Sequence, residues 1–172
     1  MFLFDKMDVY KILKGSVRMI TETEMIEIIN NKTYSRQELT QHQRFVDFKL
    51  WMTFMNKINR DDLVMQLFPH ELKLDNETIV KPNISICANN IPILIVEANH
   101  CEKKFAKYQV CGVPEYWIVD QSTNLVTVHV LVGGKYFTTI YQSGDAVPVG
   151  LDDKLAINVD KLFKIDYSTQ KN

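Results

Sequence analysis

Apolar and polar residues alternate along this chain with a period that changes from segment to segment. In "TQHQRFVDFKLWMTFMNKI" (residues 40–58), apolar residues recur at steps of three and four. This spacing predicts an amphipathic helix, and Thr40 is a suitable N-cap. The face expected to be buried carries Phe45, Phe48, Trp51 or Met52, Met55 and Ile58.

Two apolar segments follow the predicted helix and favour a β-hairpin. "IVKPNISICA" (residues 79–88) alternates in polarity, "IPILIVEA" (residues 91–98) is almost continuously apolar, and Asn89 and Asn90 between them are turn formers. If the pairing is centred on Asn90, Asn83 lies opposite Glu97 on the same face of the sheet. A charged Glu97 at the end of a buried strand then needs either solvent or a partner.

The second half of the chain alternates between helix and strand signals. "CEKKFAKYQVC" (residues 101–111) favours a helix that ends at Gly112, with Pro114 preventing its continuation. Strands are predicted at "EYWIVD" (115–120), "LVTVHVLV" (125–132) and "KYFTTIY" (135–141), the last two joined by a Gly-Gly turn. This order of elements predicts an α+β fold.

Composition narrows the class of protein. A chain of 172 residues with 46% hydrophobic content is expected to form one globular domain spanning residues 1–172. Its formal net charge of -1 means that any nucleic-acid binding must depend on a local basic patch. No apolar run is long enough for a membrane span, so no membrane partner is expected. Three cysteines at irregular spacing favour reduced thiols and a cytoplasmic location.

Several segments together resemble one known family. "VKPNISI", "ILIVEA", the lysine-bearing helix after them and above all "GVPEYWIVD" resemble the Uma-type restriction endonucleases, a branch of the PD-(D/E)XK nuclease superfamily. "EMIEIINNK" is similar to the early strand of that family, "TQHQRFV" to its His-Gln helix start and "LAINVDKLF" to its C-terminal segment. The resemblance implies a restriction-endonuclease-like fold, in which helices flank a mixed central sheet.

The resemblance also implies a metal-dependent DNA endonuclease. In that chemistry, strand carboxylates hold Mg²⁺ or Mn²⁺ and a nearby lysine stabilises developing negative charge. Glu97 occupies the glutamate position, Asn83 the position of the other metal ligand, and Lys104 that of the helical lysine. Glu27 and His42 fall where the family places further pocket residues. A solvated strand position for Glu27, and a helix-start role for His42, are equally consistent with the sequence.

The chain departs from the family pattern in ways that affect catalysis. An aspartate is expected at position 83, and an amide there lacks the negative charge that attracts a hard cation. The loop before Lys104 is also short. We therefore expect weak metal binding and an impaired endonuclease, with a non-catalytic nucleic-acid-binding or protein-interaction module as the alternative. The sequence is compatible with a homo-oligomer. The expected DNA contacts are Lys103, Lys104, Lys107 and Arg44.

Overall fold

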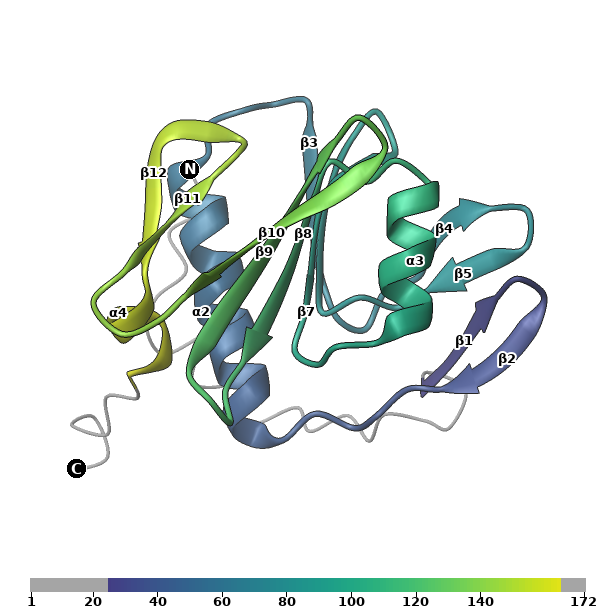
Figure 1. Cartoon of the computed structure of the whole chain (residues 1–172), viewed down its shortest axis with the longest axis horizontal. Helices are drawn as coiled ribbons and strands as arrows, with labels where there is room; N and C mark the ends of the chain where they lie inside the picture. Colours follow the sequence, from purple (N-terminus) through teal and green to yellow (C-terminus); the bar gives the residue numbers. More distant parts are fainter. Residues whose placement is uncertain (1–24, 165–172) are drawn as a thin grey trace.

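The computed structural model describes residues 25–164, in which strands and helices alternate as an α+β fold (Figure 1). The expected helices and strands between residues 41 and 141 are present, except that the segment expected as one strand (79–88) is divided between two strands, Thr78–Val80 and Ile84–Ala88, which belong to different sheets. Along the chain the elements are β1 Ile26–Ile29, β2 Lys32–Ser35, α2 Gln41–Lys57, β3 Leu63–Leu67, β4 Leu72–Asp75, β5 Thr78–Val80, β6 Ile84–Ala88, β7 Ile91–Glu97, α3 Glu102–Val110, β8 Glu115–Asp120, β9 Leu125–Val132, β10 Lys135–Tyr141, β11 Ala146–Val149, β12 Asp152–Asn158 and α4 Val159–Phe163.

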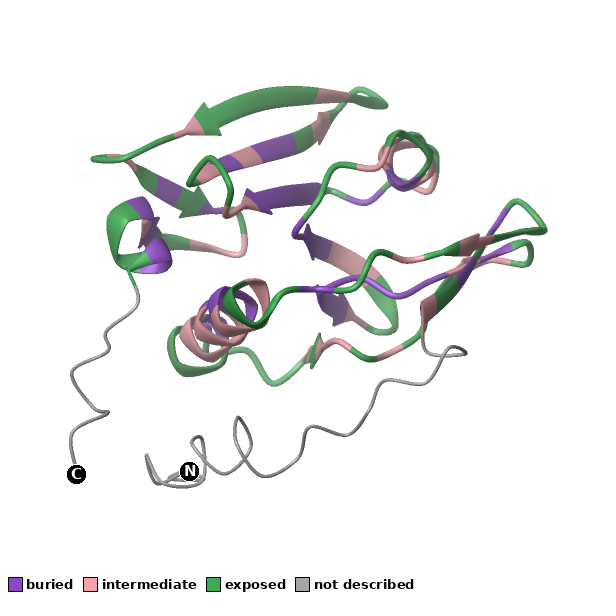
Figure 2. Cartoon of the chain, turned by 90° about the horizontal axis from the view of Figure 1, so that it is seen from below, coloured by how far each residue is buried: buried purple, intermediate pink, exposed green. Residues whose placement is uncertain are grey.

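A six-stranded mixed sheet forms the centre of the molecule. Its strand order is β10-β9-β8-β7-β6-β3, and β7 and β8 are its parallel pair, connected through α3. One face of the sheet packs against α2, and the other packs against α3 together with the small sheet β2-β1-β5-β4. The edge strand β10 is mostly exposed, whereas the strands nearer the middle are mostly buried (Figure 2). The expected arrangement, a mixed central sheet flanked by helices, is confirmed.

Helix α2 begins where the sequence predicts but buries a different face. Thr40 and Gln43 form a reciprocal capping box at its start. The stripe against the sheet is Val46, Leu50 and Phe54, whereas the predicted stripe is half-buried or exposed before Ile58. Both stripes are apolar and both have helical spacing, so periodicity cannot choose between them. Packing against the central sheet decides between them, and it buries Val46, Leu50 and Phe54.

The β6–β7 hairpin places Asn83 opposite Glu97 as expected, but this register depends on a β-bulge as well as on the turn. Asn89 and Asn90 adopt positive φ angles of 50° and 64° in the turn. Beside the turn Cys87 pairs with Pro92, and the register then shifts through a β-bulge so that Ile84 pairs with Val96. Continuing this ladder by one residue places Asn83 opposite Glu97. The bulge therefore brings the two polar side chains onto one face.

The glycine positions and the cysteines also agree with the sequence-based expectations. Gly112 has a φ of 76° after α3, and Gly133 and Gly134 have positive φ in the β9–β10 turn. Cys87, Cys101 and Cys111 are free thiols. Within residues 25–164, no helix is both long enough and apolar enough to cross a membrane.

Candidate functional site

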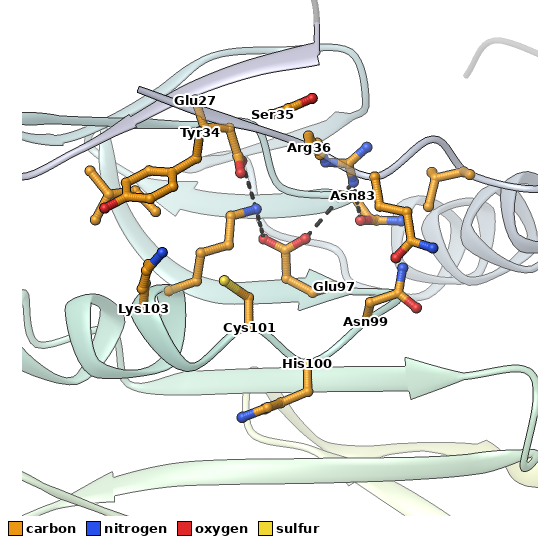
Figure 3. Close-up of a pocket in the computed structure, with 14 residues that line it drawn as sticks. Glu27, Tyr34, Ser35, Arg36, Asn83, Glu97, Asn99, His100, Cys101 and Lys103 are labelled. Carbon is orange, nitrogen blue, oxygen red and sulfur yellow. Dashed lines mark hydrogen bonds and ion pairs between the residues drawn. The ribbon is translucent and has the colours of Figure 1, made fainter. Parts of the chain in front are cut away.

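A pocket of about 300 Å³ lies where the small sheet meets the ends of the central strands (Figure 3). Its walls come from β1, β2 and the segment after β2, from the start of β6, the end of β7, and α3. The residues that line it are Glu27, Ile29, Tyr34, Ser35, Arg36, Gln37, Leu39, Asn83, Glu97, Asn99, His100, Cys101, Lys103 and Lys104. Side chains far apart in the sequence thus meet in one pocket, which has a buried floor and an exposed rim.

Glu97 is the central acid of the pocket and is only 4% exposed. Its Oε1 accepts hydrogen bonds from Lys104 Nζ at 2.6 Å and from the Tyr108 hydroxyl at 2.8 Å. Its Oε2 lies 3.8 Å from Arg36 Nη2. Burial raises the pKa of Tyr108 well above its usual value, so its hydroxyl stays a donor. The carboxylate at the end of the apolar strand β7 is therefore paired within the protein rather than exposed to solvent.

Lys104 bridges two carboxylates. Besides Glu97, its Nζ contacts Glu27 Oε1 at 2.6 Å, and both Glu27 and Lys104 are buried. The same Glu27 oxygen accepts from the backbone N–H of Lys81 at 2.6 Å. Strand β1 alternates between exposed and buried positions, and this alternation turns Glu27 inward. The alternative of a solvated Glu27 is excluded by this burial.

Both the oxygen and the nitrogen of the Asn83 side-chain amide form hydrogen bonds. Its Oδ1 accepts from Arg36 Nη2, and its Nδ2 donates to Asp47 Oδ2 at 2.5 Å. Burial raises the pKa of Asp47 to about 7; the hydrogen bond from Asn83 and the charge of Arg36 oppose this rise, while the charge of Glu97 adds to it. The amide thus connects a buried guanidinium to a buried acid.

Arg36 and Asp47 are charged site residues that sequence reasoning missed. The Arg36 side chain is 6% exposed and stacks over the Phe68 ring with Cζ 4.1 Å from the ring centroid. It follows β2 in a polar segment that carries no recognisable motif. For Asp47 the signal was ambiguous, because this acid lies beside Val46 and Leu50 on α2, and periodicity does not identify their stripe as the buried one. An acid in such a position needs a partner, which here is Asn83.

Comparisons with known proteins agree with the sequence resemblance. The model of the Uma2 family, described as "Putative restriction endonuclease", matches residues 96–160, a span that includes Glu97 and Lys104. The crystal structure of "a putative nuclease belonging to DUF820" from Anabaena variabilis ATCC 29413 superposes with a TM-score of 0.67 at 17% identity, covering 83% of this chain and 92% of that one. The resemblance to the Uma-type family is confirmed. Among curated proteins, none matches the chain.

The other residues expected at the Uma-type site lie in different surroundings. His42 is exposed at the start of α2 and does not line the pocket; its carbonyl accepts from Gln121 Nε2 at 2.6 Å. Arg44 pairs with Glu38 at 3.1 Å and also lies outside the pocket lining. His42 therefore lies at the helix start, but its contact with Gln121 is made by its carbonyl and not by its imidazole.

The three lysines of α3 point in different directions, as a helix requires. Lys104 faces Glu97, whereas Lys103 is exposed at the pocket rim with Nζ 4.0 Å from the Tyr34 ring centroid. Lys107 pairs with Asp75 at 2.5 Å. Lys104 is too deeply buried to contact DNA on the surface, so its expected DNA contact is not available in this arrangement.

The pocket does not fit a divalent metal ion in the arrangement described. The two expected ligand side chains, Asn83 and Glu97, already face a cation, because Arg36 Nη2 hydrogen-bonds the amide oxygen and lies near the carboxylate (Figure 3). Among residues 25–164, no three His, Cys, Asp or Glu side chains are arranged to hold a metal. The donor set is thus one carboxylate and one neutral amide, both in contact with Arg36.

Proposed function

We propose that this chain is a Uma-type nuclease-fold protein that binds DNA, with impaired metal-dependent phosphodiester cleavage and only weak affinity for Mg²⁺ or Mn²⁺. The observation that carries the proposal is the meeting of Asn83, Glu97 and Lys104 in one buried pocket, with the guanidinium of Arg36 contacting the first two. The family resemblance assigns these positions to a nuclease site, whereas the charges there are already balanced within the protein.

The position of Lys104 supports the impairment. Its ammonium is 2.6 Å from oxygens of both Glu97 and Glu27. A lysine that assists phosphodiester cleavage must lend its positive charge to the negative charge that develops on the phosphate. Two carboxylates at contact distance in a buried space leave little of that charge for a substrate.

A lysine-lined groove beside the pocket supports DNA binding. Lys32, Lys103 and Lys107 line this groove of about 370 Å³ together with Tyr34, between the β1–β2 hairpin and α3. Lys32 and Lys103 are exposed, and Lys103 lines both the groove and the pocket. Because the chain as a whole has a net charge of -1, a local set of lysines is what a phosphate backbone would contact.

Duplex binding at increasing salt tests the first part of the proposal. We expect the variant Lys32→Ala/Lys103→Ala to bind a fluorescently labelled duplex several-fold more weakly, and its log–log salt slope to fall by about one for each lost lysine. The matched control is Lys154→Ala, an exposed lysine on β12, which should bind as the natural chain does. Equal binding by all three proteins would show that the DNA contacts lie outside this groove, and no binding by any of them would favour a protein-interaction module instead.

Plasmid nicking tests the second part. With Mg²⁺ or Mn²⁺ present, we expect the natural chain to nick DNA slowly or not at all, because the metal-facing groups are neutral or already paired. Lys104→Ala should leave that low activity unchanged. Rapid nicking that disappears in Lys104→Ala would show that the site is fully active and that the proposed impairment is wrong.

A further inference from the structure

Arg36 occupies the space between the two expected metal ligands. Its Nη2 donates to Asn83 Oδ1 and lies 3.8 Å from Glu97 Oε2, and its cationic group stacks on Phe68. The side chain is 6% exposed. Its Nη1 has no hydrogen-bond partner within the described part of the chain. A guanidinium buried with an unpaired donor is costly, so its position is maintained by the acceptors and the ring around it.

The formal charges of the buried side chains in the pocket balance when Arg36 is present. Glu27 and Glu97 supply two negative charges, and Lys104 and Arg36 supply two positive ones, all within ion-pair distance of a partner. Asp47 contacts Asn83 rather than either cation. A divalent ion added to this buried set would bring two uncompensated positive charges next to a guanidinium. Metal can therefore enter only if Arg36 leaves.

We propose that Arg36 is a built-in cation that takes the place of the divalent metal, so that Arg36 as well as Asn83 keeps metal out of the pocket. This inference deepens the proposed function, because it rests on the assignment of the pocket as a nuclease site. It has a counter-intuitive consequence for Asn83→Asp. A guanidinium binds a carboxylate more strongly than an amide, often through two parallel hydrogen bonds. Asn83→Asp alone therefore strengthens the binding of Arg36, which competes with the metal for the pocket.

Calorimetric titration with Mn²⁺ on four proteins tests the inference: the natural chain, Asn83→Asp, Arg36→Gln, and the double variant Arg36→Gln/Asn83→Asp. We expect weak binding by the first three, with affinities that agree within about threefold. The double variant should bind at least tenfold more tightly. Thermal melts with and without Mn²⁺ give a second readout, and the melting temperature should rise with metal in the double variant alone.

Two results would overturn the inference. The first is Asn83→Asp binding Mn²⁺ as tightly as the double variant, since Arg36 would then not be a competitor. The second is a folded double variant that binds no better than the natural chain. If loss of Arg36 prevents folding, Asn83→Asp still decides, because it keeps Arg36 and should show no metal-induced rise in melting temperature. These measurements contain no DNA, so their failure is distinguishable from failure of DNA binding or nicking.

Discussion

Asp47 is an acid held against the central sheet with an amide for its partner. It is 3% exposed, and its pKa is raised to about 7 because burial disfavours the carboxylate. Between the ordinary value of 3.8 and this raised value, the folded chain binds a proton that the unfolded chain has released. The contribution of Asp47 to stability is therefore fully present at low pH and is lost as the pH rises towards 7.

Asp47→Asn tests this pH dependence. A neutral amide keeps an acceptor for Asn83 but cannot ionise. The variant should therefore lack the fall in the free energy of unfolding that Asp47 causes as the pH rises. Relative to the natural chain, its free energy of unfolding should improve by about 2 kcal/mol between pH 5 and pH 7, because the slope of about 1.4 kcal/mol for each pH unit falls to half as the pH reaches the raised pKa of Asp47. Urea denaturation at several pH values measures this difference.

Asp153→Asn is the matched control, because Asp153 is an exposed acid on β12. Its stability profile should run parallel to that of the natural chain. Parallel profiles for Asp47→Asn as well would mean that Asp47 titrates near its ordinary pKa in the folded protein.

The hairpin formed by β6 and β7 determines which polar side chains share the pocket. Its two-residue turn places Asn89 and Asn90 in the left-handed region, with φ of 50° and 64°. Turns of this kind favour Asn followed by Gly, because only glycine adopts such angles without a steric penalty. The bulge beyond the turn then brings Asn83 opposite Glu97.

Substitutions at Asn90 test this account of the turn. Asn90→Ala should lower the free energy of unfolding by about 1 kcal/mol, because alanine is strained at positive φ. Asn90→Gly should stay within about 0.5 kcal/mol of the natural chain or exceed it. Chemical denaturation of the pair measures the contrast, and indistinguishable alanine and glycine variants would contradict a left-handed requirement at this position.

Glu115 joins two sheets and explains part of the "GVPEYWIVD" segment. It is buried on β8, and its Oε1 accepts from Trp117 Nε1 at 2.6 Å. Its Oε2 accepts from the backbone N–H of Gly150, which lies between β11 and β12, at 3.0 Å. The β11–β12 hairpin is thereby connected to the central sheet. The acid in the most specific segment of the sequence thus serves the assembly of the fold rather than the pocket.

Gly150→Ala tests this connection. A Cβ at position 150 would lie 2.4 Å from Glu115 Oε2, too close for the present arrangement. The buried carboxylate must move and its hydrogen bonds weaken, which should lower the free energy of unfolding by about 1–3 kcal/mol. Thermal and urea denaturation measure the loss. Lys154→Ala in the same hairpin should change stability by less than about 0.5 kcal/mol.

For the folded fraction of Gly150→Ala, duplex affinity should match that of the natural chain, because Gly150 and Glu115 do not line the pocket or the lysine-lined groove. A stable Gly150→Ala protein would indicate that the β11–β12 hairpin shifts freely and contributes little to the central sheet.

Local patterns in the sequence, together with the family resemblance, were sufficient to predict the α+β fold and the meeting of Asn83, Glu97 and Lys104 in one pocket. The hairpin, the helix that carries Lys104, and the resemblance around Glu97 depend on neighbours in the chain. Periodicity and turn chemistry report such neighbours directly. Trp117, on the predicted strand 115–120, is fully buried beside Phe54.

Only the tertiary structure decided which charges meet in the pocket. Arg36 reaches Asn83 and Glu97 from a polar segment between β2 and α2, and Asp47 reaches Asn83 because α2 packs through the stripe that holds Val46 and Leu50. His42, one and a half turns earlier, faces away from the pocket. The energy of a buried charge depends on the partners that packing brings within a few ångströms, and linear spacing does not encode those distances.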